Sequence, residues 1–127
     1  MFSFKRRVGN EAEALALNHL TQQGLKLIEQ NYLCKLGEID IIMLDNNPET
    51  LVFVEVRYRK NTFHGTALET VTRKKQQKLM RTAQLYLQKN PTYQHFLCRF
   101  DVVGLESDLK CPTITWIQDA FMFEERS

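Results

Sequence analysis

The sequence contains few cysteines, and their spacing matches neither a metal site nor a disulfide framework. Cys34, Cys98 and Cys111 are scattered, with no C-x-x-C pair and no histidine at zinc-finger spacing. An odd, unclustered set of this kind favours a reducing compartment. The sequence also lacks an apolar run of the roughly 20 residues that span a membrane, and the apolar segment that would follow the basic residues 5–7 in a signal peptide. We therefore expect a cytoplasmic protein with no membrane partner.

A strong net charge, internal repeats and low-complexity linkers are absent as well. The net charge of +2 permits a nucleic-acid partner but does not require one. The 127 residues, of which 43% are hydrophobic, suffice for one domain with a real core. We expect a single domain that spans residues 1–127.

The spacing of apolar residues predicts two helices and five strands. The first helix has Asn10 as its N-cap and ends at Gly24, and the second begins at the capping box Thr66–Glu69 and stops at Asn90. Strands are expected at residues 25–34, 38–44, 51–59, 99–105 and 113–117. The order α-β-β-β-α-β-β predicts an α/β fold with a mixed sheet flanked by helices, in which the first three strands form an antiparallel meander.

An acidic residue interrupts each of two apolar strands, Asp40 in the segment 37–44 and Glu55 in the segment 51–57. Side chains alternate along a strand, so Glu55 and Arg57 share a face, and a hairpin would bring Asp40 beside Glu55. Because a buried, unpaired carboxylate is costly, two acids that meet there favour a hard divalent cation held by oxygen ligands. The alternative is an ion pair between one of these acids and Arg57 at the end of a half-exposed sheet.

Two helical residues extend this set and leave alternatives open. Glu13 is either a capping acid at the third helical position after Asn10, or an inward-facing residue that positions a ligand or a water. Lys75 falls between Val71 and Leu79 in an apolar i+4 series. Its side chain therefore either snorkels to solvent or reaches toward the acidic cavity.

Carboxylates that hold Mg²⁺, together with cations that stabilise developing negative charge, are what phosphodiester hydrolysis requires. The candidate catalytic residues are Glu13, Asp40, Glu55, Arg57 and Lys75. Lysine and arginine side chains beyond the site would contact successive phosphates of DNA. The candidate nucleic-acid-binding residues are Arg59, Lys60, Arg73, Lys74 and Lys78.

Asp40 followed by Glu55-Val56-Arg57 resembles the D…(D/E)-x-K signature of the restriction-endonuclease-like superfamily. More narrowly, an ordered set of blocks along nearly the whole chain resembles the YraN family of bacterial proteins, which is related to archaeal Holliday-junction resolvases. The blocks lie at residues 9–24, 31–40, 51–56, 75–87, 99–103 and 120–121.

The resemblance implies a restriction-endonuclease-like three-layer core and a nuclease-like pocket. It implies Mg²⁺ or Mn²⁺ held by Asp40, Glu55 and the carbonyl of Val56, with Glu13 as the helical acid. DNA is the implied partner, and a homodimer is expected by analogy with resolvases.

Arg57 departs from the superfamily pattern, which has Lys at this position. Arginine is a planar and permanently charged fork, whereas lysine is a compact cation whose pKa can shift. Either Lys75 takes over the role of that lysine from the helix, or the chain binds without catalysing.

Three hypotheses follow. The first is a Mg²⁺-dependent endonuclease acting on branched or single-stranded DNA. The second is a catalytically impaired nucleic-acid-binding module on a nuclease fold, and the third is an assembly protein whose acids form surface ion pairs.

Overall fold

The computed structural model describes residues 4–46, 48–61, 63 and 65–123. A helix α1 (Phe4–Gln22) precedes three strands, β1 (Lys26–Cys34), β2 (Gly37–Asn46) and β3 (Glu49–Arg59). A helical connection then leads to two more strands. It consists of α2 (Ala67–Thr70), α3 (Arg73–Lys89) and the 3₁₀ turn η1 (Pro91–Tyr93), and it is followed by β4 (Leu97–Glu106) and β5 (Thr113–Phe121). The predicted order of helices and strands is confirmed.

The five strands form one mixed sheet in the order β1-β2-β3-β4-β5. The pairs β1–β2, β2–β3 and β4–β5 are antiparallel, whereas β3 and β4 are parallel and are joined by the helical connection. The antiparallel meander predicted for the first three strands is therefore correct. The central position of β3 agrees with its burial, since residues 50–55 are all buried.

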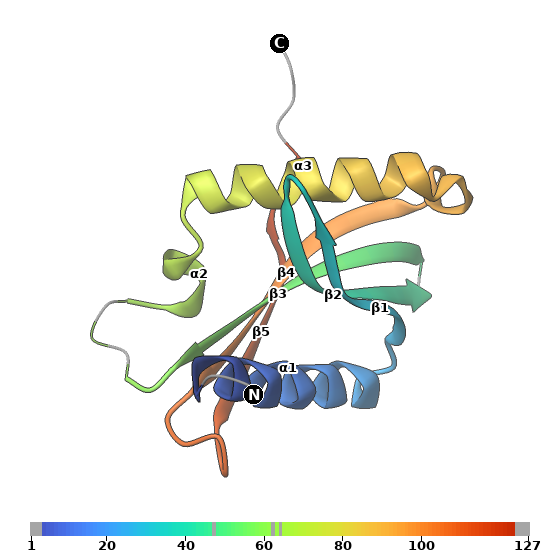
Figure 1. Ribbon diagram of the computed structural model, residues 1–127. Helices are drawn as coiled ribbons and strands as arrows, with labels where there is room; N and C mark the ends of the chain where they lie inside the picture. The colour runs from blue at the N-terminus through green and yellow to red at the C-terminus, as the bar shows by residue number, and fades with distance from the viewer. Residues whose placement is uncertain (1–3, 47, 62, 64, 124–127) are drawn as a thin grey trace.

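Helices cover both faces of the sheet and give the molecule three layers. Figure 1 shows α1 on one face, with α2 and α3 on the other. Side chains of β3 alternate between the two resulting cores: Val52 and Val54 pack with Leu20 of α1, whereas Phe53 packs with Leu79 of α3.

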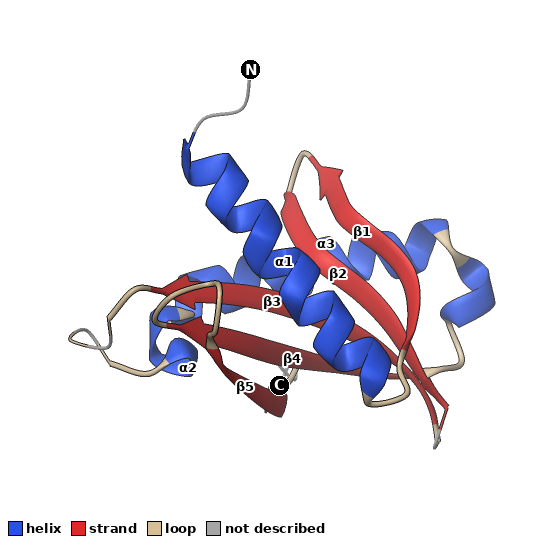
Figure 2. Cartoon of the chain, turned by 90° about the horizontal axis from the view of Figure 1, so that it is seen from below, coloured by secondary structure: helices blue, strands red, loops and turns tan. Residues whose placement is uncertain are grey.

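Strands β2 and β3 separate before the end of the sheet. The β2–β3 ladder ends at the pair Ile41 and Val54. Residues 37–39 of β2 continue to pair with β1, and residues 55–59 of β3 continue to pair with β4. We call this divergence of β2 from β3, beyond Ile41 and Val54, the strand fork, and Figure 2 shows β1 and β2 splaying away from β3.

The first helix corrects one expectation. It begins at Phe4, so Asn10 lies within it and is not its N-cap. Glu13 is consequently in the third turn and cannot act as a capping acid. The predicted end is correct, because Gly24 adopts a φ of +100° and Leu25 donates its N–H to the carbonyl of Leu20.

The second predicted helix is in fact two helices. The capping box at Thr66 and Glu69 is present, but the helix that it opens has only four residues. At Val71 the backbone leaves the helical region, and Thr72 then caps α3 by accepting the N–H of Lys75 over 3.2 Å. Thr66 and Thr72, six residues apart, can each cap the N-terminus of a helix. The structure uses both, one for each helix.

The last strand is longer than predicted, since it reaches Phe121 and not Ile117. Asp119, with a φ of 52°, lies in the irregular stretch of the β4–β5 pairing. That irregularity lets Phe121 stack on Phe100 with ring centroids 4.9 Å apart. Within the described residues, no helix is both long and apolar enough to cross a membrane.

Candidate active site

Asp40 lies at the strand fork, one residue beyond the last β2–β3 pair. Its Oδ2 accepts the backbone N–H of Val56 over 2.8 Å. A carboxylate therefore occupies the place where a continuing ladder would offer a backbone carbonyl. The side chain of Asp40 is fixed in the opening because both strands hold it.

Three acids meet at this opening. Glu13 reaches it from α1, and Glu38 and Asp40 reach it from β2, with one oxygen of each lying within 4.8 Å of the others. We call these three residues the acidic cluster. Opposite oxygen ligands of Mg²⁺ or Ca²⁺ stand about 4–5 Å apart, at twice the metal–oxygen distance. The acidic cluster thus has the dimensions of a coordination sphere.

The amide of Asn31 ties the acidic cluster together. Its Nδ2 donates to Oε2 of Glu13 over 2.9 Å and to Oε1 of Glu38 over 3.2 Å. Asn31 has a φ of 51°, a left-handed conformation that asparagine tolerates better than most residues. This backbone irregularity in β1 aims the amide at two carboxylates from different elements.

The acids carry more negative charge than their surroundings compensate. Burial, followed by the charge of Glu55, raises the pKa of Asp40 to about 7, against the opposing hydrogen bond from Val56. Burial also raises the pKa of Glu13 to about 7, and the hydrogen bond from Asn31 opposes this rise. Both shifts have the same physical reason, since ionised carboxylates are poorly solvated and repel each other here.

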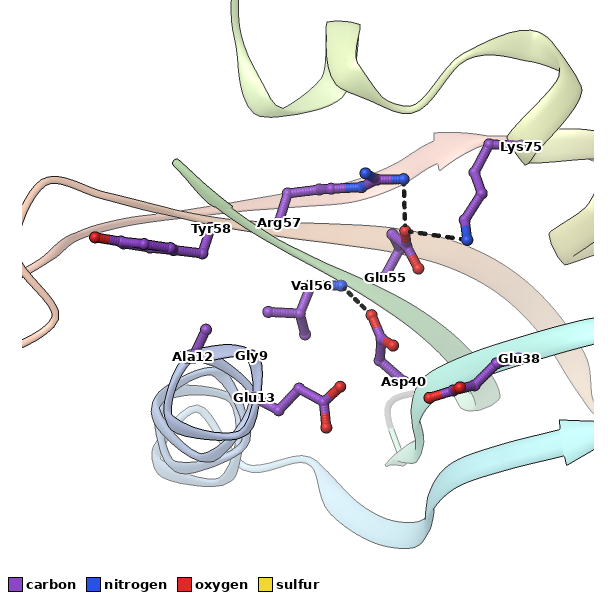
Figure 3. Close-up of a pocket in the computed structure, with 10 residues that line it drawn as sticks. All are labelled: Gly9, Ala12, Glu13, Glu38, Asp40, Glu55, Val56, Arg57, Tyr58 and Lys75. Carbon is purple, nitrogen blue, oxygen red and sulfur yellow. Dashed lines mark hydrogen bonds and ion pairs between the residues drawn. The ribbon is translucent and has the colours of Figure 1, made fainter. Parts of the chain in front are cut away.

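Basic groups stand on the far side of Asp40, around Glu55. Nη2 of Arg57 lies 2.8 Å from Oε2 of Glu55, and Nζ of Lys75 lies 3.9 Å from the same oxygen. Lys75 therefore extends from α3 toward Glu55, one of the two orientations left open by the sequence, while its side chain stays 38% exposed. Figure 3 shows Lys75 and Arg57 converging on Glu55, with Asp40 on the other side of β3.

The acidic cluster and the residues around Glu55 line one cavity of about 250 Å³, which we call the acid cavity. It brings together all five candidate catalytic residues and Val56, whose roles stay predictions. The lining residues are Gly9, Ala12, Glu13, Glu38, Asp40, Glu55, Val56, Arg57, Tyr58 and Lys75.

Sequence reasoning missed Glu38 and Asn31. Glu38 is two residues before Asp40, so the alternation of a strand already placed both on one face. Asn31 had no comparable signal, because its position depends on a left-handed residue in β1 and on the β1–β2 register. The metal ligands predicted from the resemblance were Asp40, Glu55 and the Val56 carbonyl, whereas the acidic cluster shares only Asp40 with that set.

The candidate nucleic-acid-binding residues do not line the acid cavity. Arg59, at the end of β3, is mostly buried and forms an ion pair with Glu106 of β4. Lys60 is exposed just beyond β3. Arg73, Lys74 and Lys78 are exposed on the first turns of α3, the helix that carries Lys75. Contact with DNA stays a prediction for all five.

Comparison with known proteins gives a consistent result. A model of the uncharacterised protein family UPF0102 matches residues 12–105, a segment that contains the acidic cluster and both basic residues beside Glu55. The chain is 50% identical over 113 residues to a UPF0102 protein of Stutzerimonas stutzeri, covering 89% of this chain and 92% of that protein. It is 48% identical over 120 residues to a UPF0102 protein of Pseudomonas syringae pv. syringae, covering 94% of this chain and 96% of that protein. It is also 47% identical over 119 residues to one of Nitrosococcus oceani, covering 94% of each chain.

Proposed function

Since the chain belongs to the uncharacterised protein family UPF0102, we propose its function from the site itself: a Mg²⁺- or Mn²⁺-dependent endonuclease that hydrolyses phosphodiester bonds of DNA. The observation that carries the proposal is the strand fork. There, Asp40 stands between Glu13 and Glu38 on one side and Glu55 with its two cationic partners on the other.

The residues present fit a hard divalent cation. The acidic cluster offers carboxylate oxygens, the ligands that Mg²⁺ and Mn²⁺ prefer, and no soft sulfur or imidazole ligand belongs to it. The raised pKa values of Glu13 and Asp40 reflect negative charge that a dication would neutralise. Asp40 and Glu13 would hold the ion, with Glu38 completing the set from β2.

The chain's own residues then have distinct tasks. A bound metal would polarise the phosphate and lower the pKa of a water molecule. Lys75 and Arg57 present cationic groups beside Glu55, where they would stabilise the negative charge that develops on the phosphate during attack. Asn31 holds the carboxylates of Glu13 and Glu38 in place, so that little reorganisation is needed on binding.

Exposed lysines support DNA as the substrate. Lys74 and Lys78 stand on α3, the helix that sends Lys75 into the acid cavity, and Lys60 follows the strand that carries Glu55. Such cations bind phosphates without reading sequence, and their contribution falls with rising salt.

The test is cleavage by the purified protein, with Mg²⁺ or Mn²⁺, of linear duplex, single-stranded and four-way-junction DNA. We expect metal-dependent cleavage of at least one substrate, and loss of that cleavage in Asp40→Asn. Glu11→Gln is the matched control, because Glu11 is an exposed acid on the same helix as Glu13. Cleavage by Asp40→Asn at the rate of the control, or no cleavage by the wild type, would refute the proposal.

One observation favours a second candidate, a nucleic-acid-binding module without turnover. Arg57 forms a 2.8 Å ion pair with Glu55, and so occupies a carboxylate oxygen that the predicted metal site would use. On this second account the wild type binds DNA in a salt-dependent and chelator-independent way and does not cleave it. Arg57→Lys would then produce cleavage, because lysine is a smaller cation that leaves more of Glu55 accessible.

A further inference from the structure

A second cavity adjoins the acid cavity, and one aromatic side chain belongs to both. The second cavity has a volume of about 470 Å³ and is lined by Tyr58, Lys60, Ser107 and Asp108. This volume lies within the roughly 300–1,000 Å³ typical of small-molecule sites. Tyr58 also lines the acid cavity, and so it is the residue that the two cavities share.

The ring of Tyr58 is held at both ends. Its hydroxyl donates to the backbone carbonyl of Ser107 over 2.6 Å. Its ring packs against the core on the α1 side of the sheet, and β3 pairs with β4 at this position. A ring fixed in this way loses little conformational freedom when a planar group stacks on it.

Two small residues of α1, Gly9 and Ala12, share the acid cavity with Tyr58. A Cβ atom placed on Gly9 would meet no atom within 4 Å, so space is open at that position. Figure 3 shows the carboxylates of Glu13 and Asp40 toward one end of this space, and Tyr58 and Ala12 at the other.

We propose that Tyr58 is a stacking platform for an unpaired base of the nucleotide next to the phosphate held at Asp40. The substrate class is therefore single-stranded DNA, or a DNA strand with an unpaired nucleotide. This inference rests on the proposed function for the identity of the reacting phosphate. It makes Tyr58 a specificity-determining residue.

The physical reason is that a base inside a duplex already has neighbours on both of its faces. Only an unpaired base can lie on a protein side chain, and every base has a face that an aromatic ring accepts. Lys60 lies two residues beyond Tyr58, about 7 Å along the strand direction, and offers a cation to the following phosphate. Asp108 lines the same cavity, and one oxygen of its carboxylate accepts the backbone N–H of Lys110 over 2.9 Å.

The test measures binding of a single-stranded oligonucleotide that carries one 2-aminopurine, a base analogue whose fluorescence falls on stacking. Ca²⁺ replaces Mg²⁺ as the hard cation. We expect quenching with the wild type and about 5- to 150-fold weaker binding with Tyr58→Leu, the equivalent of one lost base stack. Tyr58→Phe keeps the ring and is expected to bind within about twofold of the wild type.

A second variant changes α1 instead of Tyr58 and removes no packing. Gly9→Leu has room for its side chain and replaces a helical glycine, so we expect unchanged or higher stability. It adds bulk at a position that lines the acid cavity, and should weaken binding of the single strand more than binding of a duplex.

The outcomes separate this inference from the proposed function. Equal losses on single-stranded and duplex DNA in Tyr58→Leu, no quenching in the wild type, or no binding of single strands would overturn the stacking platform. Metal-dependent cleavage by the wild type would leave the nuclease proposal standing in each of those cases. Conversely, quenching that depends on Tyr58, without any cleavage in Mg²⁺ or Mn²⁺, would support the platform and refute the nuclease.

Discussion

Asp40→Asn is expected to stabilise the metal-free protein while abolishing its response to metal. The substitution keeps the shape of the side chain and an oxygen that can accept the N–H of Val56. It removes a carboxylate whose pKa is raised from 3.8 to about 7, mainly by burial and then by the charge of Glu55. The stability gain therefore depends on pH.

The sign follows from proton binding. A carboxyl with a raised pKa in the folded protein binds its proton more tightly there than in the unfolded chain. Its contribution to the free energy of unfolding is complete below about pH 4 and is lost as the pH rises through about 7. About three pH units at ~1.36 kcal/mol each give a loss of at most about 4 kcal/mol. Asp40→Asn has no such proton, so its advantage over the wild type should appear between about pH 4 and pH 8.

The assay is urea unfolding at about pH 4 and pH 8, with chelator and with Mg²⁺. With chelator, Asp40→Asn should match the wild type at the lower pH and exceed it at the higher one. Added Mg²⁺ should stabilise the wild type, because a ligand that binds only the folded state adds to stability, and should leave Asp40→Asn unchanged. Glu11→Gln should follow the wild type throughout. No stability gain in Asp40→Asn at pH 8 would refute the account of repelling, poorly solvated acids.

Three further substitutions test one contact of the acidic cluster and two buried contacts of the fold. Asn31→Gly keeps the left-handed backbone but removes the hydrogen bonds to two acids, so calorimetry should show Mn²⁺ binding weakened roughly 10- to 100-fold without unfolding. Asp101→Ala should cost about 3–5 kcal/mol in urea unfolding, because the nearly fully buried Asp101 carboxylate accepts hydrogen bonds from Arg99 of β4 and from two N–H groups of β5. The folded fraction should still bind Mn²⁺. Gly104→Ala places a Cβ 2.5 Å from that of Ala67 and should lower stability by about 1–3 kcal/mol. Adding Ala67→Gly should restore part of that loss, and an additive loss in the double variant would show that the two residues do not clash.

The sequence predicted those parts of the fold that local chemistry decides. Alternation of apolar residues located the strands, Gly24 marked the end of α1, and Thr66 and Glu69 formed the expected capping box. The same alternation put Glu55 and Arg57 on one face of β3, where they form an ion pair.

The remaining features depend on which of several possible helix ends is used, or on how strands pair. A single sequence does not show either. The start of α1 at Phe4 was missed because the first two turns lack an apolar period. The break at Val71 was missed because the apolar series continues through it, although Thr72 supplies a second cap. The contact of Asn31 with Glu13 requires the β1–β2 register and a left-handed residue, neither of which the pattern encodes.

The acids that surround Asp40 also depend on how the strands pair. Asp40 was expected beside Glu55, and its raised pKa shows that the two carboxyls do influence each other. The three acids that meet within 4.8 Å, however, are Asp40, Glu13 of α1 and Glu38 of β2, without Glu55. The strand fork accounts for this arrangement, because β2 leaves β3 on the N-terminal side of Ile41, where Asp40 lies next to Glu13 of α1.

The most direct test of the central claim is the anomalous diffraction of a crystal soaked in Mn²⁺. The account predicts a peak within about 2.0–2.6 Å of an Asp40 carboxylate oxygen, with Glu13 or Glu38 among the other ligands. Crystals that hold Mn²⁺ elsewhere, with no peak at Asp40, would contradict it.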